Sequence, residues 1–334
     1  MFAHSLTYKT VWSAFFAALL LSSCSQDGGE AAEPVENTRK PMLFNASVDG
    51  QTSRGALLTE LAGQFGLFAT ESYSGNEEQQ TFNYINNEAV AKDEEGVWKT
   101  LNQVNSPMPG WKMNFYAYLP YQAATMSQPY LIFNGGESNY TGVPYFDFTI
   151  NDVVEEQIDL MTAQNTGQST FMVLNDSLIP LTFDHILAAV KFTIDASVQA
   201  GFVKKITIKQ VPDGGVFKYD DTTDWDSLHT NMKDYSVNTE ISSTATGENA
   251  TQLAENKIFM MMPGELPEGA ALTITLDDGQ NTELTQSLAG KTWEGGKVTT
   301  YNIKVNSASG GKNKMSLTVK VSDWEDVAKA HYTF

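Results

Sequence analysis

The chain has 334 residues, of which 40 are acidic and 21 are lysine or arginine, so its formal net charge is −19. Nucleic acid and anionic membrane surfaces are therefore poor partners, because binding to phosphates needs clustered lysine and arginine. The chain is too long for one small hydrophobic core, so two domains are expected. Its single cysteine excludes an intramolecular disulfide, which leaves hydrophobic burial and backbone pairing to stabilise the fold.

The first residues have the features of a secretory signal. Lys9 is the only lysine or arginine before an almost wholly apolar run over residues 11–21. This run is shorter than the roughly 20 apolar residues that span a bilayer, so residues 1–23 are expected to be a signal peptide. The run ends in Leu21-Ser22-Ser23-Cys24, which resembles the bacterial lipobox. The resemblance implies a lipoprotein with acyl chains such as palmitate on Cys24; an ordinary signal peptide with an incidental cysteine is the alternative.

Residues 24–40 are expected to form a disordered acidic tether, because their small and acidic side chains cannot bury enough apolar surface to fold. The folded body follows. We expect an N-terminal β-sandwich domain over residues 41–175 and a C-terminal β-sandwich domain over residues 176–334, with the boundary in the polar segments 164–168 and 175–177.

The body predicts many short strands, because apolar and polar residues alternate between clusters of Gly, Asn, Asp and Pro. The alternating or β-prone segments are, in chain order, 42–48, 114–118, 191–194, 206–209, 271–276, 299–305 and 315–321. Asp277-Asp278-Gly279 is a hairpin turn signal. The polar stretches 71–80 and 236–255 are expected to be exposed loops, and residues 186–190 are the best helical candidate. The pattern predicts an all-β chain of β-sandwiches.

Enzyme chemistry finds little support in the sequence. No His-Glu-x-x-His, Gly-x-Ser-x-Gly or P-loop motif occurs. His4, His185, His229 and His331 are widely separated, so no zinc site is predicted, and His185 is expected at the core edge of a strand. The acidic pairs at 94–95, 220–221 and 277–278 are interpreted as solvated turns rather than calcium sites. We therefore expect no enzyme, metal or cofactor, and keep a lipid-anchored hydrolase as a rival.

Aromatic residues in the segment 130–148 could form an adhesive surface. Tyr130, Tyr140, Tyr145 and Phe146 lie there among Gly, Asn and Pro. Aromatic side chains in loops stack on sugars or anchor protein interfaces. The alternative is that they pack against the sandwich to which they belong.

Several stretches, taken together, resemble the fimbrillin-like family of Bacteroidales, which comprises subunits and accessory proteins of type V pili. The resemblance runs through residues 42–44 and 52–54, Phe65-Gly66-Leu67-Phe68-Ala69, Trp98, Phe115-Tyr116-Ala117-Tyr118-Leu119-Pro120, 158–163, 181–192, Trp293-Glu294-Gly295-Gly296-Lys297, 298–303 and Val321-Ser322-Asp323-Trp324. It implies two tandem transthyretin-like β-sandwiches. It also implies export as a lipoprotein to the surface-exposed side of the cell outer membrane and assembly into a fimbrium, or pilus, that serves cell adhesion.

The resemblance also implies how such a subunit polymerises. In polymerising members an arginine-specific protease cuts behind the first strand, which leaves and is replaced by a strand from another subunit. Here the strand would be the one bearing Met42, Phe44, Ala46 and Val48, with cleavage between Arg54 and Gly55. Arg39 and Arg54 are the only arginines of the chain, and a general scarcity of arginine is the alternative explanation.

The donated strand is the second requirement of this mechanism. The alternating residues Ala330, Tyr332 and Phe334 are a possible donor strand at the C-terminus, and a plain tail is the alternative. We interpret residues 315–321 as the final strand of the second sandwich.

The expected function is that of a fimbrial structural subunit assembled by protease-triggered donor-strand exchange. The alternative is a non-polymerising pilus anchor, tip adhesin or carbohydrate-binding surface lipoprotein. The expected partners are other fimbrial subunits, the outer membrane through the lipid on Cys24, an arginine-specific protease, and a host or bacterial surface glycan or protein, but no nucleic acid.

Overall fold

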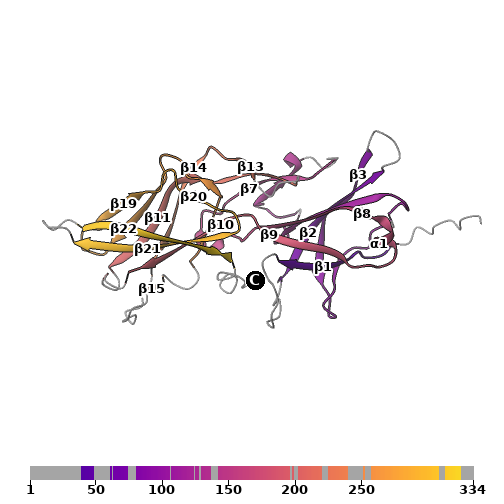
Figure 1. Cartoon of the computed structure of the whole chain (residues 1–334), viewed down its shortest axis with the longest axis horizontal. Helices are drawn as coiled ribbons and strands as arrows, with labels where there is room; N and C mark the ends of the chain where they lie inside the picture. The colour runs from indigo at the N-terminus through magenta and orange to yellow at the C-terminus, as the bar shows by residue number, and fades with distance from the viewer. Residues whose placement is uncertain are drawn as a thin grey trace, which may run out of the picture. The chain divides into compact units, whose positions relative to one another are not determined.

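The computed structural model describes most of the chain after residue 38. The described residues are 39–48, 61, 63–73, 80–105, 107–123, 125–127, 129–136, 142–195, 198, 202–219, 225–239, 251–252, 257–307 and 313–324. Most of them lie in strands (Figure 1), so the prediction of an all-β chain is confirmed. The helices among them are short: α1 (Thr170–Leu174) and the 3-10 turns η1 (Asn134–Gly136) and η2 (Val154–Glu156).

Seven strands close into a barrel in the order β1-β4-β3-β2-β5-β8-β9. Neighbouring strands run antiparallel, except that β1 and β9 run parallel. The bounds are β1 (Leu43–Val48), β2 (Gln64–Tyr73), β3 (Gln80–Lys92), β4 (Trp98–Thr100), β5 (Lys112–Leu119), β8 (Met161–Ser169) and β9 (Ile179–His185). The predicted strands at 42–48 and 114–118 are therefore present.

Strands β2 and β5 face two cores at once. Phe65, Leu67 and Ala69 of β2, with Phe115 and Ala117 of β5, pack inside the barrel. The residues between them in sequence belong to a second, larger core: Phe68, Tyr116 and Tyr118. Successive side chains of a strand point to opposite faces, so a strand buried on both sides has an almost continuous apolar sequence. This accounts for the run from Phe115 to Leu119.

The remaining strands form four sheets. Two of them have four strands each: one, which we call the small sheet because its strands are short, has the order β13-β12-β7-β6, and the other has the order β14-β11-β18-β19. A five-stranded sheet has the order β15-β10-β21-β22, with β16 also on β10, and β17 pairs with β20. Their bounds are β6 (Leu131–Phe133), β7 (Tyr145–Thr149), β10 (Ala188–Ile194), β11 (Val203–Pro212), β12 (Gly214–Lys218), β13 (Trp225–Leu228), β14 (Met232–Asn238), β15 (Thr251–Gln252), β16 (Phe259–Met261), β17 (Gly264–Glu265), β18 (Ala271–Leu276), β19 (Glu283–Ser287), β20 (Thr292–Trp293), β21 (Lys297–Ser307) and β22 (Asn313–Asp323).

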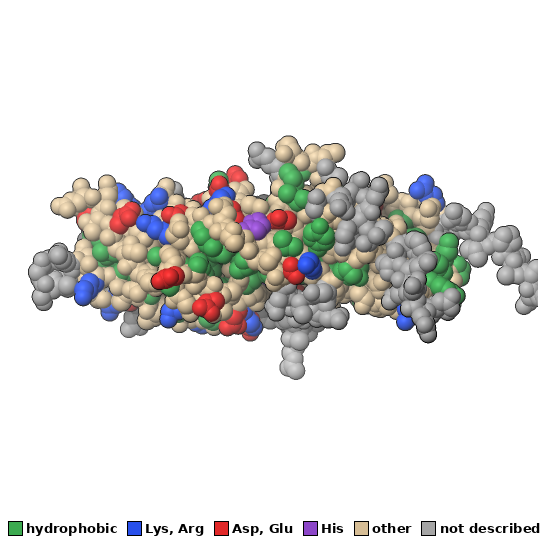
Figure 2. Space-filling view, turned by 90° about the horizontal axis from the view of Figure 1, so that it is seen from above, with side chains coloured by type: hydrophobic (Ala, Val, Ile, Leu, Met, Phe, Trp, Pro, Cys, Tyr) green, Lys and Arg blue, Asp and Glu red, His purple; other side chains and the backbone are tan. Residues whose placement is uncertain are grey.

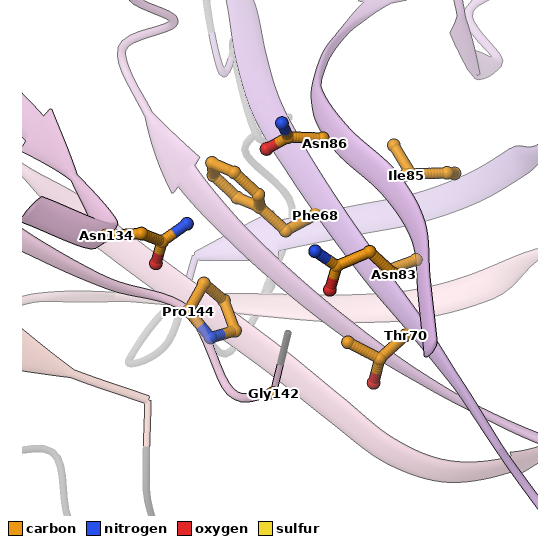
Figure 3. Close-up of a pocket in the computed structure, with 9 residues that line it drawn as sticks. Phe68, Thr70, Asn83, Ile85, Asn86, Asn134, Gly142 and Pro144 are labelled. Carbon is orange, nitrogen blue, oxygen red and sulfur yellow. The ribbon is translucent and has the colours of Figure 1, made fainter. Parts of the chain in front are cut away.

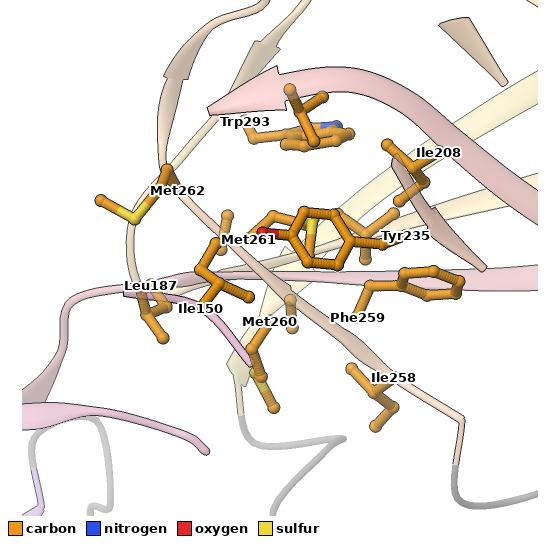
Figure 4. Packing of buried hydrophobic residues seen from close by; sticks show 14 of the residues in the cluster. Ile150, Leu187, Ile208, Tyr235, Ile258, Phe259, Met260, Met261, Met262 and Trp293 are labelled. Atoms are coloured by element: carbon orange, nitrogen blue, oxygen red, sulfur yellow. The ribbon is translucent and has the colours of Figure 1, made fainter. Parts of the chain in front are cut away.

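The larger core lies among these sheets. Figure 4 shows Met261 on the same side of its strand as Tyr235 and Trp293, while Ile258 and Met260 point to the other side. Met260 and Met261 are almost fully buried, and flexible methionine side chains fill irregular gaps of this kind. The backbone N–H of Met260 donates to Oε1 of Gln157 at 2.8 Å, which satisfies a polar group inside the core.

Three expectations about local structure are wrong. The stretch 236–255 is not a loop throughout, because β14 extends to Asn238 and β15 (Thr251–Gln252) lies within it. Residues 186–190 are not helical: Ala188, Ala189 and Val190 open β10, where all three pair with β16 and the last two also pair with β21. All five residues of the run are buried, and an apolar run of this length is equally consistent with a fully buried strand. The stretch 71–80 is not a loop throughout, because β2 extends to Tyr73 and β3 starts at Gln80.

Strand pairing crosses the expected domain boundary at residues 175 and 176. The strand β9, which follows it, completes the barrel through β1 and β8. The strand β7, which precedes it, pairs with β12 over five residue pairs. The two domain ranges stay a prediction, and both halves of the chain contribute to the barrel and to the small sheet.

Candidate functional site: the first strand and its groove

The first strand closes the barrel with unequal contacts on its two sides. On one side β1 pairs with β9 from Phe44 with Ile179 to Val48 with Phe183. On the other side it pairs with β4 only through Leu43 with Lys99 and Phe44 with Trp98. Among the described residues, the register pairs no residue of β1 beyond Phe44 on the β4 side, so most of the strand is paired there along one edge.

The side chains of β1 enter the barrel core most deeply at its beginning. Met42, just before the strand, and Phe44 are 2% and 1% exposed. The Phe44 ring meets the edges of Phe65 and Phe115, with ring centroids 5.9 Å apart in each pair. Ala46 and Val48 are only partly buried and pack at the margin of the core. The predicted alternation of this strand therefore points into the barrel, and Phe44 makes its main contact.

A group of polar contacts fixes the chain where it enters the barrel. The amide of Met42 donates to Oγ1 of Thr100 and the amide of Thr100 donates to the carbonyl of Met42, both at 3.1 Å. The ammonium of Lys40 donates to the carbonyl of Leu174 at 2.9 Å and contacts the Asp176 carboxylate at 2.7 Å. Lys40 and Val104 also exchange backbone hydrogen bonds of 3.0 Å. These contacts to α1 and β4 were not predicted, since only the folded chain brings the segments together.

The barrel residues around β1 are apolar, and we call the space that β1 fills among them the groove. The barrel residues packed beneath it include Trp98, Ile179, Leu181 and Phe183, besides the two phenylalanines that contact Phe44. The strands on either side, β4 and β9, would each have a free backbone edge if β1 were absent. Removing β1 would thus expose both apolar side chains and unpaired N–H and C=O groups, the two features that recruit another strand.

The other predicted processing and assembly residues lie outside the described part of the chain. These are Cys24, Arg54 and Gly55 near the N-terminus and Ala330, Tyr332 and Phe334 at the C-terminus. The described chain ends at Trp324, after β22. The predicted strand over 315–321 is present in β22, which pairs along its whole length with β21.

His185 ends β9 where the barrel meets the last described residue. Its Nδ1 lies 2.9 Å from Oδ1 of Asp159, and its ring stacks on Trp324 with centroids 4.3 Å apart. The prediction that His185 lies at the core edge of a strand is confirmed. Among the described residues, no group of three or more His, Cys, Asp or Glu side chains could hold a metal ion.

In the acidic turn at Asp277 and Asp278, backbone amides of the turn donate hydrogen bonds to the Asp278 carboxylate. Oδ1 of Asp278 accepts from the amides of Gln280 and Thr282 at 3.0 and 3.2 Å. Hydrogen bonds from Thr282 lower the pKa of the Asp278 carboxyl. The predicted hairpin is present, as β18 pairs with β19 across this turn.

A shallow hollow lies on the outer face of the barrel, next to the segment that we considered as an adhesive surface (Figure 3). Its empty volume is about 220 Å³, and Asn83, Asn86, Asn134, Phe68 and Pro144 line it together with Thr70 and Gly142. Of the four aromatic residues named for that surface, Phe146 is fully buried and Tyr130 donates from its hydroxyl to the carbonyl of Pro120 at 2.7 Å. These two residues pack into the fold, and Tyr140 lies outside the described residues.

No helix in the described residues is both long and apolar enough to cross a membrane.

Solved structures that this chain resembles share its fold at low sequence identity. A fimbrial protein from Bacteroides vulgatus ATCC 8482 matches with a TM-score of 0.59 and 16% identity, over 86% of this chain and 100% of that one. A candidate cell adhesion protein from Bacteroides ovatus ATCC 8483 matches with a TM-score of 0.58 and 17% identity, over 86% of this chain and 98% of that one. Another candidate cell adhesion protein, from Bacteroides uniformis ATCC 8492, matches with a TM-score of 0.53 and 17% identity, over 85% of this chain and 98% of that one. No curated protein matches the chain.

The family model described as fimbrillin-like matches residues 53–324, which is most of the chain and covers the barrel from β2 onward as well as the later sheets. The chain therefore belongs to the fimbrillin-like family.

Proposed function

We propose that this protein is a structural subunit of a fimbrium, assembled on the cell surface by donor-strand exchange after a protease removes its first strand. The observation that carries the proposal is the way β1 is bound. It fills an apolar groove between two strands, and its pairing with β4 is limited to two residue pairs. Family membership supports a fimbrial or adhesive role. The exchange, the protease and the lipid anchor are our inferences.

Cleavage between Arg54 and Gly55 would separate β1 covalently from the rest of the barrel. β1 ends at Val48 and β2 starts at Gln64, so the cut falls in the connection between them. A cut there leaves β2 and all later strands in one piece. It turns β1 from part of the same chain into a separate segment that can dissociate. The segment is then held by its pairing with β9 and β4, by the burial of Met42 and Phe44, and by the polar contacts of Lys40 and Met42.

The vacated groove would favour one kind of occupant, an extended strand with alternating apolar side chains. The partner must place a large apolar residue where Phe44 lies between Phe65 and Phe115. A strand shifted by one residue would direct its polar side chains into the core. The C-terminal residues Ala330, Tyr332 and Phe334 of a neighbouring subunit have this alternation and are the donor we propose.

The test is the N-terminal mass of the protein taken from the cell surface, compared with two arginine variants. We expect the native protein to start at Gly55 without a lipid, and Arg54→Ala to remain full length from an acylated Cys24 and to form no polymer. Arg39→Ala is the matched control, since it removes the only other arginine and should mature normally. Normal cleaved polymer from Arg54→Ala would exclude this processing site.

A second candidate function is a non-polymerising tip or anchor adhesin that binds a carbohydrate, and the hollow beside Phe68 favours it. Three asparagine amides, from Asn83, Asn86 and Asn134, line it together with Thr70, and amides suit sugar hydroxyls as donors and acceptors. The roughly 220 Å³ of this hollow includes open solvent and does not enclose a ligand, so a sugar would lie against its surface. Binding of a glycan array by wild type but not by Asn83→Ala/Asn86→Ala, with an acylated N-terminus, would favour this function.

A further inference from the structure

One end of the barrel carries a cluster of five exposed apolar side chains and the partly buried Trp111. We call this cluster the end patch: Tyr73, Leu101, Met108, Trp111, Phe171 and Leu178. Phe171 is 69% exposed and Met108 57%, although both are large and apolar. Five of the eleven exposed large hydrophobic residues in the described part of the chain belong to this patch. Figure 1 shows α1, which carries Phe171, at the end of the barrel beside β3 and β8. Figure 2 shows hydrophobic side chains gathered at the same end.

Hydrogen bonds and a ring contact connect the centre of the end patch. The amide of Thr170, next to Phe171, donates to the carbonyl of Trp111 at 3.2 Å, and the amide of Trp111 donates to the carbonyl of Met108 at 3.3 Å. The Trp111 and Tyr73 rings lie 5.4 Å apart. The end of β2, the turn before β5 and the start of α1 therefore present one surface. Contiguous apolar surface of this kind marks a contact with a partner or a membrane.

The remaining two residues of the end patch lie beside the point where the chain enters the barrel. Leu101 follows Thr100, which bonds the backbone of Met42 in both directions. Leu178 lies two residues after Asp176, the partner of Lys40. The direction of β1 is fixed by its parallel pairing with β9, which starts just after α1. The segment that precedes Lys40 therefore leaves the barrel at the end patch.

The distance to the predicted lipid is short. Lys40 is the sixteenth residue after Cys24, and a flexible coil of that length, which the sequence leads us to expect here, would have a root-mean-square span of about 22 Å. A lipid on Cys24 would therefore hold the barrel near the bilayer, with the end that carries the exposed aromatic residues closest to the membrane. Tryptophan and tyrosine are the side chains enriched at membrane interfaces.

The charges around the end patch suit a headgroup region. Lys112, exposed at the start of β5, and Lys40 are the nearby cations, and the Asp176 carboxylate is paired with Lys40. Glu71 lies beneath Met108, whose amide donates to it at 3.0 Å, and is buried. The patch thus presents apolar surface and lysine to the outside, while the acidic groups named here are paired or buried.

We propose that, in the lipid-anchored form, the end patch rests in the interfacial region of the bilayer and orients the barrel on the membrane. This inference rests on the proposed lipidation of Cys24. It gives the anchored precursor a fixed orientation, with the end at which β1 enters facing the membrane. Release at Arg54 would remove the tether and free the patch together with the groove.

The test uses full-length protein with its native lipid, reconstituted in phosphatidylcholine vesicles that contain brominated phosphatidylcholine as a quencher of tryptophan fluorescence. We expect quenching in wild type and loss of most of it in Trp111→Phe, because Trp98, Trp293 and Trp324 are buried and the partly buried Trp225 packs against the larger core, outside the end patch. Phe171→Ser/Met108→Ser keeps Trp111 but should also lose most of the quenching. Val319→Ser, an exposed apolar residue on β22 outside the patch, is the matched control and should leave quenching unchanged.

Mass spectrometry of the N-terminal peptide separates the two ways in which the idea can fail. An acylated Cys24 without quenching would overturn the membrane contact and leave the lipoprotein proposal intact. A Cys24 without acyl chains would overturn both. Patch variants that change self-association in sedimentation while quenching stays the same would show that the end patch binds a second copy instead.

Discussion

Phe44 decides how firmly the first strand is held. It is almost fully buried and lies edge-on against Phe65 and Phe115. Replacing a buried phenylalanine by alanine costs about 3–5 kcal/mol through lost transfer energy and the cavity that remains. We therefore expect Phe44→Ala to lower the free energy of unfolding by that amount, measured by urea denaturation. Val48→Ala, at the partly exposed end of the same strand, is the control and should cost about 1 kcal/mol.

Gly66 permits the packing of Tyr118 between the two cores. A Cβ at Gly66 would lie 2.0 Å from a ring carbon of Tyr118, and that ring is fully buried with its hydroxyl bonded to Asn87 at 2.6 Å. The ring cannot move without breaking this bond. We expect Gly66→Ala to cost about 1–3 kcal/mol or more, as overpacked cores do.

Gly269→Ala is the matched control, because the nearest atom to its added Cβ would be Cβ of Gln210 at an ordinary 3.4 Å. Thermal unfolding of both variants measures the difference. Equal melting temperatures for the two would contradict the close approach of Gly66 to Tyr118.

The buried carboxyl of Glu71 should make stability depend on pH. Burial raises its pKa above the usual value, and the hydrogen bond from the Met108 amide opposes this only in part. A carboxyl whose pKa is higher in the folded state stabilises the fold while it is protonated, and this contribution is lost as pH rises through the raised pKa.

Glu71→Gln keeps an acceptor for the Met108 amide and removes the titration. We expect Glu71→Gln to gain stability relative to wild type as pH rises from about 4 to about 7, measured by urea denaturation at both values. A stability difference that does not change with pH would contradict the raised pKa.

At the scale of single elements, local alternation predicted strands well and long-range pairing poorly. The strands at 114–118, 206–209, 271–276 and 315–321 were all expected, because each alternates or ends in a turn signal within a few residues. The parallel partner of β1 is β9, more than 130 residues later in the chain, and no local pattern specifies such a pairing. The salt bridge of Lys40 with Asp176 escaped prediction for the same reason.

For the helical elements, the local pattern itself was insufficient, because the segments are too short to distinguish a helix from a strand. The run from Ile186 to Val190 reads equally as a buried helix or a buried strand, and its pairing with β16 and β21 decided for the strand. α1 has only five residues, with the Ser169 hydroxyl accepting from the Phe171 amide at its start. A helix this short has no periodicity to recognise.

β1 as an element should be replaceable by a peptide once the chain is cut at Arg54. We expect a peptide of residues 40–48 to bind the protein that starts at Gly55 and to block its polymerisation, because it restores the pairing with β9 and the burial of Phe44. The same peptide with Phe44→Asp should bind much more weakly, since a charge would enter the core without a partner. Titration calorimetry measures both, and equal affinity would mean that the groove is not the binding site.

At the scale of the whole molecule, the two cores are not independent. Phe68, Tyr116 and Tyr118 come from barrel strands but belong to the larger core. The Tyr219 hydroxyl donates to the carbonyl of Ala117 on β5 at 2.7 Å. The His229 ring lies between two carboxylates, with Nε2 2.8 Å from Asp147 on β7 and Nδ1 2.9 Å from Asp213, which connects β11 to β12. These contacts join segments on both sides of the expected domain boundary.

Such sharing predicts that the protein unfolds in one cooperative transition, even though its length suggests two domains. If the barrel unfolded alone, the outward faces of Phe68, Tyr116 and Tyr118 would leave the larger core, and that core would lose part of its buried apolar surface. Denaturation followed by tryptophan fluorescence and by far-ultraviolet circular dichroism should therefore give coincident curves. Native-state hydrogen exchange should assign β5 and β11 the same opening free energy. Two separate transitions, with β5 exchanging at a lower free energy than β11, would mean instead that the barrel is an autonomous domain that can release β1 while the later sheets stay folded.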